Sequence, residues 1–186
     1  QYVAFLNKLT LSQQNTRTVG EKLVSMPIGQ YVFGDNATTA PYRNGIVLAS
    51  RSGLTDPVVF ANDLNKLDEF AQDGDGQTLA CNFLTPADML AYADWTGYEK
   101  MSRQPYPAVP QRGEYSWNTT TFNLPVSLDS PGKRSETVSG GNANGGNVAA
   151  IGGPVRCGAF AKGAANQEAS GTSFWGVMDL SGILAE

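Results

Sequence analysis

Apolar residues recur at helical spacing at the start of the chain. In residues 1–14, QYVAFLNKLTLSQQ, the residues at positions i, i+3, i+4 and i+7 are Tyr2, Phe5, Leu6 and Leu9. Residues with this spacing share one face of an α-helix, so the pattern predicts an amphipathic helix over residues 1–14.

A second helix is predicted over residues 85–97, TPADMLAYADWTG. Thr85 is a natural N-cap, Pro86 suits the first helical position, and Asp88 completes a capping box and complements the helix dipole. Gly97 is suited to the left-handed cap that ends a helix. The residues expected to form the buried stripe of this helix are Met89, Tyr92 and Ala93, with Leu90 beside them.

Outside these helices, short β-leaning runs alternate with turns. Residues 15–60 contain the runs QYVFG, NGIVLAS and PVVFA, which are separated by Gly, Asn and Pro. A further strand-like run, EYSWN, occupies residues 114–118. Two helices among several short strands and long loops predict an α+β domain.

The composition agrees with one loop-rich globular domain over residues 1–186. A single core commonly serves about 100–200 residues. Charged residues make up only 16% of the chain, against a usual share of about 25%. The 21 glycines among 186 residues exceed the usual share of about 7%. The net charge of −4 argues against the basic stripe that a nucleic-acid-binding surface needs, so we expect no nucleic-acid partner.

Residue types that are scarce or missing narrow the possible functions. No apolar run approaches the roughly 18 residues of a membrane-spanning helix, so no membrane span is expected. The chain has no histidine, which removes the usual base of Ser-His-Asp and Cys-His catalysis and the commonest nitrogen ligand of zinc. The two cysteines, Cys81 and Cys157, are compatible with one disulfide or with buried thiols, and the sequence does not decide between these.

Two polar segments stand out among the loops. The run DGDG at residues 73–76 has the residue types that calcium prefers, but an EF-hand loop that begins at Asp73 requires Glu where this chain has Leu84. We therefore interpret DGDG as an ordinary polar turn. Residues 139–153, SGGNANGGNVAAIGG, combine Gly and Asn, which both tolerate left-handed backbone and expose carbonyl groups.

Five segments of the chain carry a resemblance to a known family. They are QYVAFLN, CNFLTPADMLAYADWTG, GEYSWNT, GGNANGGN and SFWGVMDLSGILAE, in this order. Together they resemble the formylglycine-generating-enzyme-like family, in particular the branches common in Bacteroidetes and phages that include variable surface adhesins and envelope lipoproteins. The resemblance implies a C-type-lectin-like fold, a compact α+β domain in which two helices flank a small twisted sheet.

Three departures from the family pattern indicate an incomplete chain. Gly97 is followed directly by Tyr98, where relatives carry a further stretch, so we expect residues to be missing between the two. The closing turn, which usually reads Gly-Asn-x-Trp-Glu, is Gly-Ile-Leu-Ala-Glu at residues 182–186. The family's C-terminal part, with the oxidases' metal-binding cysteine pair and the adhesins' variable ligand face, does not follow. We therefore expect a domain that is incomplete at its C-terminus.

The resemblance also implies two structural calcium sites. The ligands expected in the closing turn are the side chains of Asp179 and Glu186 and the backbone carbonyls of Gly182 and Leu184. The ligands expected in the Gly- and Asn-rich stretch are Asn144, Gly145, Asn147 and Ala149. Carboxylates among the apolar neighbours of the closing turn are costly to bury unless their charge is matched. For both sites the alternative is a well-packed turn without metal.

These observations lead to a hypothesis for function. We expect a non-catalytic, calcium-stabilised binding or structural module with no catalytic residues, displayed on a cell envelope or virion surface. Its partners would be a protein or glycan ligand, or neighbours in an assembly. One alternative is a copper-dependent oxidase that converts a substrate cysteine to formylglycine, which requires two closely placed thiolates because these select Cu(I). Another is a purely architectural subunit of a larger assembly.

Overall fold

The computed structural model divides the chain into two compact units. Unit 1 comprises Gln1–Gln77 and Cys81–Met101, and unit 2 comprises Thr78–Ala80 and Ser102–Glu186. The structure describes residues 1–18, 23–34, 39–67, 69–97, 115–144, 149, 151–161, 163–164, 166–173 and 178. Each unit has its own cluster of buried apolar side chains, so each is described by itself.

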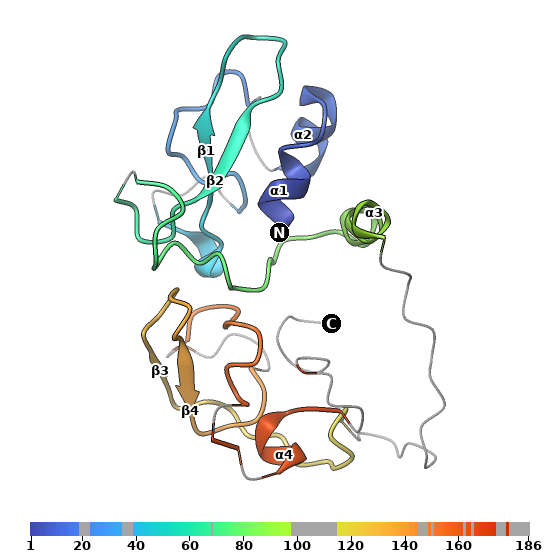
Figure 1. Cartoon of the computed structure of the whole chain (residues 1–186), viewed down its shortest axis with the longest axis vertical. Helices are drawn as coiled ribbons and strands as arrows, with labels where there is room; N and C mark the ends of the chain where they lie inside the picture. Colours follow the sequence, from blue (N-terminus) through green and yellow to red (C-terminus); the bar gives the residue numbers. More distant parts are fainter. Residues whose placement is uncertain are drawn as a thin grey trace. The chain divides into compact units, whose positions relative to one another are not determined.

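Unit 1 is built from short helices and a two-stranded antiparallel sheet (Figure 1). Its elements are α1 (Tyr2–Leu6), α2 (Leu11–Arg17), the 3₁₀ turn η1 (Pro41–Arg43), β1 (Ile46–Ser50), β2 (Val59–Asn62) and α3 (Pro86–Thr96). In the sheet Val47 pairs with Ala61 and Leu48 with Phe60, and Tyr31 forms an isolated bridge to Val47. The three runs predicted to favour strands therefore lie side by side.

The helix predicted over residues 1–14 is wrong in its continuity and right in its buried face. Tyr2, Phe5 and Leu6 are buried, but the chain leaves the helix after α1 and starts α2 anew. Asn7 stops the first helix by pairing with β2, because its side chain donates to Phe60 O at 3.0 Å and accepts from Phe60 N at 2.8 Å. Thr10 then caps α2 in a capping box with Gln13.

A buried polar side chain ties α2 to the sheet. Gln14 is 0% exposed, and its amide nitrogen donates to Leu6 O and Val58 O, both at 3.0 Å. Its amide oxygen accepts from Val58 N at 2.9 Å. Because both of its amide atoms have hydrogen-bond partners, Gln14 can lie inside at a low cost.

Helix α3 has the ends that the sequence predicts. Thr85 and Asp88 form a capping box, Pro86 occupies the first turn, and Gly97 is left-handed with φ of 72°. The predicted buried stripe, however, is right only at Tyr92 and is wrong at Met89 and Leu90. Met89 and Leu90 are 51% and 55% exposed, whereas Asp88 is buried and Ala91 and Tyr92 pack against the core.

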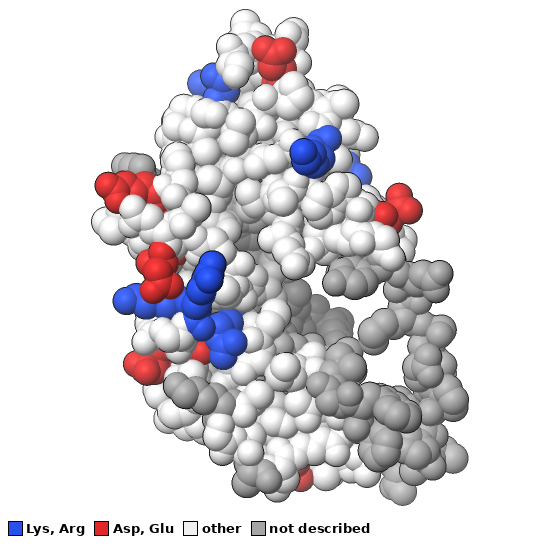
Figure 2. All heavy atoms as spheres, in the orientation of Figure 1, with Lys and Arg blue, Asp and Glu red and all other residues white. Residues whose placement is uncertain are grey.

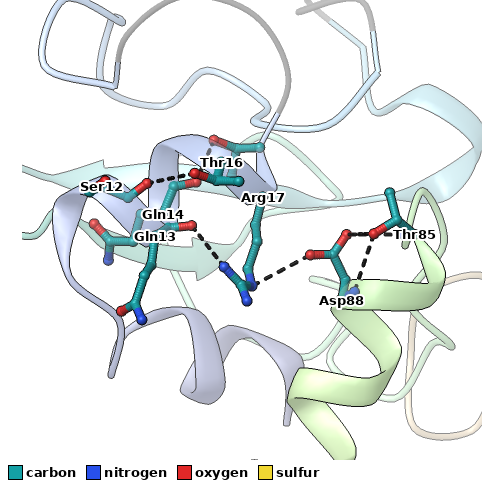
Figure 3. A network of polar contacts seen from close by, with 8 residues as sticks. Ser12, Gln13, Gln14, Thr16, Arg17, Thr85 and Asp88 are labelled. Carbon is teal, nitrogen blue, oxygen red and sulfur yellow. Dashed lines mark hydrogen bonds and ion pairs between the residues drawn. The ribbon is translucent and has the colours of Figure 1, made fainter.

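An ion pair explains this rotation of α3. Asp88 is only 7% exposed, and its Oδ1 lies 3.4 Å from Nε of Arg17 at the end of α2, as Figure 3 shows. The Arg17 guanidinium also lies over the ring of Phe5, 5.8 Å from its centroid. A charged residue is tolerated on the buried face of a helix when it is paired and hydrogen-bonded, so the apolar pattern alone does not determine which face of α3 is buried.

The described part of unit 2 has less regular structure than that of unit 1. It contains the antiparallel pair β3 (Ser127–Asp129) and β4 (Thr137–Ser139), the short helix α4 (Gln167–Ser170) and a bridge between Leu79 and Arg156. Its apolar cluster consists of Ile151, Val155, Ala159 and Phe160, with Leu128 and Val138 packed against it.

The prediction of a strand at residues 114–118 is wrong for the described residues 115–118. The described part of this run forms a turn, in which Asn118 has φ of 67° and its N–H donates to Tyr115 O at 2.9 Å. Trp117 is buried and stacks on Tyr115, with ring centroids 4.9 Å apart. Aromatic packing within the segment takes the place of pairing with another strand.

The observed class is mixed α+β and loop-rich, with few helices and short antiparallel strands, as predicted. Among the described residues, no helix has the length and apolar character needed to cross a membrane. The expected break between Gly97 and Tyr98 falls on a residue outside the described ranges. The single domain over residues 1–186 stays a prediction.

Candidate metal centre

The Gly- and Asn-rich stretch directly follows the β3–β4 hairpin of unit 2. β4 ends at Ser139, and Gly140 and Gly141 follow with φ of 66° and 75°. A Cβ on Gly141 would lie 2.6 Å from Pro125 N, closer than real Cβ atoms approach. Only glycine fits this left-handed position, and the turn that it makes leads the chain to Asn142, which is buried.

Asn142 anchors the stretch to a neighbouring segment. Its backbone N–H donates to Asn123 O at 3.0 Å, and its Oδ1 accepts from Asn123 N at 3.0 Å. Its Nδ2 donates to Thr121 O at 3.2 Å. Asn142 is 3% exposed and has a partner at both amide atoms, so its role in the described structure is to hold the loop.

Asn144 lies two residues further on and is 1% exposed. Its Nδ2 donates to Gly153 O at 2.7 Å, which fixes the orientation of the amide, since a flipped amide would place two oxygens against each other. Its Oδ1 is buried and has no hydrogen-bond partner in the part of the chain that the structure describes. Leaving a buried acceptor unmatched costs about 1–3 kcal/mol. Asn144 Oδ1 is therefore available to a donor or a cation.

The structure describes two of the eight residues expected to bind calcium. Asn144 is buried, as a ligand to a structural ion would be, whereas Ala149 is exposed. The others, Gly145, Asn147, Asp179, Gly182, Leu184 and Glu186, lie outside the described residues, so the two predicted ligand sets stay predictions.

The atom available at Asn144 suits calcium better than a softer metal. Calcium is bound by six to eight oxygens from carboxylates, amides, backbone carbonyls and water, whereas zinc and copper favour thiolate and imidazole. Within the described ranges, no three His, Cys, Asp or Glu residues are grouped as a metal site. A calcium ion at Asn144 would therefore take its other oxygens from carbonyl groups or from residues outside those ranges.

Sequence reasoning missed the buried carboxylates. Glu136 of unit 2 is 0% exposed, and its oxygens accept from Gly132 N at 2.6 Å and Arg156 N at 2.7 Å. Because both oxygens accept from backbone donors, Glu136 joins two loops of the described structure. Asp63 and Asp75 of unit 1 are also 0% exposed. No local sequence signal marks Glu136, whose partner Arg156 is distant in the chain.

The cysteines bear on the copper alternative. Neither Cys81 nor Cys157 takes part in a disulfide. Burial raises the pKa of the Cys81 thiol to about 12, although a hydrogen bond from Asn44 lowers it in part. The Asn44 amide lies 3.9 Å from the Cys81 sulfur. A thiol held neutral in this way is a poor ligand for Cu(I), which binds the thiolate.

A polar hollow lies next to Asn142 in unit 2. Its volume is about 280 Å³, and its lining consists of Asn123, Gly141, Asn142, Asn166, Glu168 and Ala169. Ligand pockets for cofactors are usually larger and mostly apolar, at roughly 300–1,000 Å³. The hollow suits a hydrogen-bonding group presented at the surface better than an organic cofactor.

Comparisons of the chain with protein-family models, with curated proteins and with solved structures found no match. The functional hypothesis therefore rests on the residues and their geometry, above all on the orientation of Asn144.

Proposed function

We propose that this chain is a non-catalytic binding or structural module whose loops are stabilised by calcium. Its type would be formylglycine-generating-enzyme-like with a C-type-lectin-like fold, and its place would be a cell envelope or virion surface. The observation that carries the calcium part is the buried Asn144 Oδ1, which has no donor among the described residues. A cation is the partner that such an oxygen, held in a loop rich in carbonyl groups, can take.

The short elements in the described part of unit 2 also favour a bound ion. Its described strands have three residues each, and its helix has four. Backbone groups outside helices and strands need other partners, and a cation that gathers several carbonyls supplies them. Calcium would thus take the place of a larger hydrophobic core in this unit.

The non-catalytic part is supported by the state of Cys81. The oxidase alternative requires a pair of reactive thiolates, and Cys81 does not supply one of them, because burial keeps its thiol neutral by raising its pKa to about 12. Cys81 also belongs to the segment that packs against the core of unit 1. A structural role explains both features.

A polar ligand is favoured over nucleic acid. On the face shown in Figure 2, Lys and Arg side chains are interspersed with Asp and Glu, and the net charge of the chain is −4. Nucleic-acid-binding surfaces carry a continuous basic patch. The amide-lined hollow of unit 2 offers hydrogen-bonding groups of the kind that recognise a glycan or a protein backbone.

Thermal unfolding of matched asparagine variants tests the calcium part. We expect the melting temperature of the unchanged chain to be higher in excess calcium than in chelator. Asn144→Ala removes a ligand oxygen and should abolish the calcium-dependent increase that arises at this site. Asn142→Ala is the control, because Asn142 is equally buried but is engaged in hydrogen bonds at both amide atoms.

The two variants are expected to differ in how their melting temperatures depend on calcium. Asn142→Ala should lower the melting temperature by a similar amount in calcium and in chelator, because it removes hydrogen bonds that do not involve the ion. If Asn144→Ala retains the full calcium-dependent increase of the unchanged chain, Asn144 is not a calcium ligand and the proposal loses its main support.

A further inference from the structure

Two carboxylates of unit 1 are fully buried, and each keeps an oxygen without a donor. Asp63 and Asp75 are both 0% exposed. Asp63 Oδ2 and Asp75 Oδ1 have no hydrogen-bond partner, and neither carboxylate forms an ion pair, within the described part of the chain. A buried carboxylate is strongly disfavoured unless its charge is matched. Two such groups in one loop region require a compensating partner.

The position of Asp63 is fixed by the sheet. Asp63 directly follows β2, and its N–H donates to Gly45 O at 2.8 Å. Its backbone carbonyl accepts from the Tyr31 hydroxyl at 3.1 Å, and its Oδ1 accepts from Leu67 N at 3.1 Å. These contacts hold the side chain in place and leave Oδ2 as its unmatched atom.

Asp75 lies further along the chain, and a backbone N–H of its own segment holds its side chain. Its Oδ2 accepts from Gln72 N at 2.6 Å, which leaves Oδ1 unmatched. A Cβ on Gly74 would lie 3.4 Å from Asn65 Nδ2, so the segment that carries Asn65 lies against the segment that carries Asp75. The expected polar turn at residues 73–76 is therefore present, but one of its carboxylates points inward.

The two carboxylates interact electrostatically. Burial is the main cause that raises the pKa of Asp75; a hydrogen bond from the Gln72 backbone lowers it, and the charge of Asp63 raises it again. Lys66 lies in the same loop, but its Nζ is placed over the ring of Tyr31, 5.1 Å from the centroid. The repulsion between the carboxylates is removed either by a proton on one of them or by a cation between them.

We propose that Asp63 and Asp75 bind one calcium ion through the two unmatched oxygens. Asn65 lies beside Gly74 through its Nδ2, and its Oδ1 accepts from Leu67 N at 3.1 Å, so Asn65 holds the loop and the remaining ligands would be loop carbonyls and water. Calcium accepts an irregular shell of carboxylates, amides and loop carbonyls, whereas magnesium demands near-octahedral geometry and keeps its water. This site stands on different residues from Asn144 and does not depend on the proposed function.

The test counts calcium ions on the full chain by isothermal titration calorimetry after treatment with chelator. Asp75→Asn should bind one calcium ion fewer per chain than the unchanged protein, and Asp63→Asn should show the same loss. Asp56→Asn, an exposed aspartate of unit 1, is the control and should bind the same number as the unchanged chain. Using both buried positions keeps the test decisive if one variant fails to fold.

Stability provides a second readout that a purely structural aspartate would not give. With calcium at about 100 times its dissociation constant, the ratio of folded to unfolded chain should rise about 100-fold through this site. Asp75→Asn should lose this rise, yet in chelator it should be at least as stable as the unchanged chain, because it removes a buried negative charge. Magnesium at the same concentration should have a smaller effect.

Several results would overturn the proposal. Equal calcium numbers in Asp75→Asn, Asp63→Asn and the unchanged chain would do so, as would an equal effect of magnesium. A calcium response that Asn144→Ala removes entirely and Asp75→Asn leaves intact would locate calcium in unit 2 only. If calcium has no effect, and the unchanged chain in chelator gains stability at lower pH whereas Asp75→Asn does not, the carboxylates share a proton.

Discussion

Asn142 and Asn144 are two residues apart and both buried, yet only Asn142 has partners for both of its amide atoms. The same contrast separates Glu136, whose oxygens accept from two backbone N–H groups, from Asp63 and Asp75. A buried polar atom with partners stabilises a fold, whereas one without partners costs free energy until something binds it. This contrast at the scale of single atoms distinguishes the structural residues from the candidate ligands.

Thiol labelling tests the description of Cys81. A rise in pKa from 9.0 to about 12 leaves about 1,000-fold less thiolate near neutral pH than an ordinary thiol has. We expect iodoacetamide to alkylate exposed Cys157 rapidly and Cys81 very slowly, with the Cys81 rate rising about tenfold per pH unit. Peptide mass spectrometry after timed labelling measures both rates. Comparable rates at the two cysteines in the folded chain would contradict the burial of Cys81.

At the residue scale the sequence indicates which side chains could bind a cation, but not which of them are buried or lack hydrogen-bond partners. Asn144 is a candidate ligand in the sequence only through the family resemblance, and neither the resemblance nor the residue type indicates that its Oδ1 is buried without a donor. For Asp75 the sequence predicts an exposed position in a polar turn. The residue is buried instead, because its loop packs against residues near Asp63. The sequence contains no local signal for that contact.

At the scale of elements, α3 was predicted correctly at both ends, because its capping groups are local in sequence. Thr85, Pro86, Asp88 and Gly97 each act within one helical turn. The predicted buried face is right at Tyr92 and wrong at Met89 and Leu90, because the buried Asp88 is matched by Arg17 from α2, which is a contact between distant parts of the chain. Local chemistry therefore determines where this helix begins and ends, and tertiary pairing determines how it is rotated.

Replacing Asp88 should destabilise unit 1 substantially. Asp88→Ala removes the ion pair with Arg17 and the capping box with Thr85, and it leaves the largely buried Arg17 guanidinium without its carboxylate. We expect a loss of about 2–4 kcal/mol in the free energy of unfolding, measured by urea denaturation. Asp94→Ala, an exposed position on the same helix, is the control and should change stability by no more than about 0.5 kcal/mol. Similar effects of the two variants would show that the ion pair does not orient α3.

Two helix-terminal glycines offer a matched pair of tests. Gly97 and Gly171 are both left-handed, with φ of 72° and 64°. A Cβ on Gly97 would meet nothing within 4 Å, whereas a Cβ on Gly171 would lie 2.2 Å from Asn142 O. Gly97→Ala should cost about 1–2 kcal/mol from backbone strain alone, and Gly171→Ala should cost clearly more and displace the Asn142 loop. Equal costs in thermal unfolding would contradict the packing of α4 against that loop.

The other elements show why sequence patterns succeeded only in part. The strands β1 and β2 follow the predicted runs, because their apolar residues pair across a short connection. The helix expected over residues 1–14 is divided because Asn7 binds Phe60, a residue far along the chain. The run EYSWN has the residue types of a strand but forms a turn, since Tyr115 and Trp117 stack on each other.

At the scale of the whole molecule, both units bury polar oxygens that lack donors among the described residues, Asn144 in unit 2 and Asp63 and Asp75 in unit 1. An ion that binds the folded chain and not the unfolded chain shifts the folding equilibrium toward the folded state. Calcium would therefore act on the stability of each unit separately, through different residues.

Native mass spectrometry of the full chain is the most direct test of calcium stabilisation. We predict that the folded chain, purified in calcium and exchanged into volatile buffer, retains calcium in whole-number steps of mass. Chelator should remove the calcium and shift the charge-state distribution toward that of an unfolded chain. A folded chain that carries no calcium, and whose charge states do not change with chelator, would contradict the account.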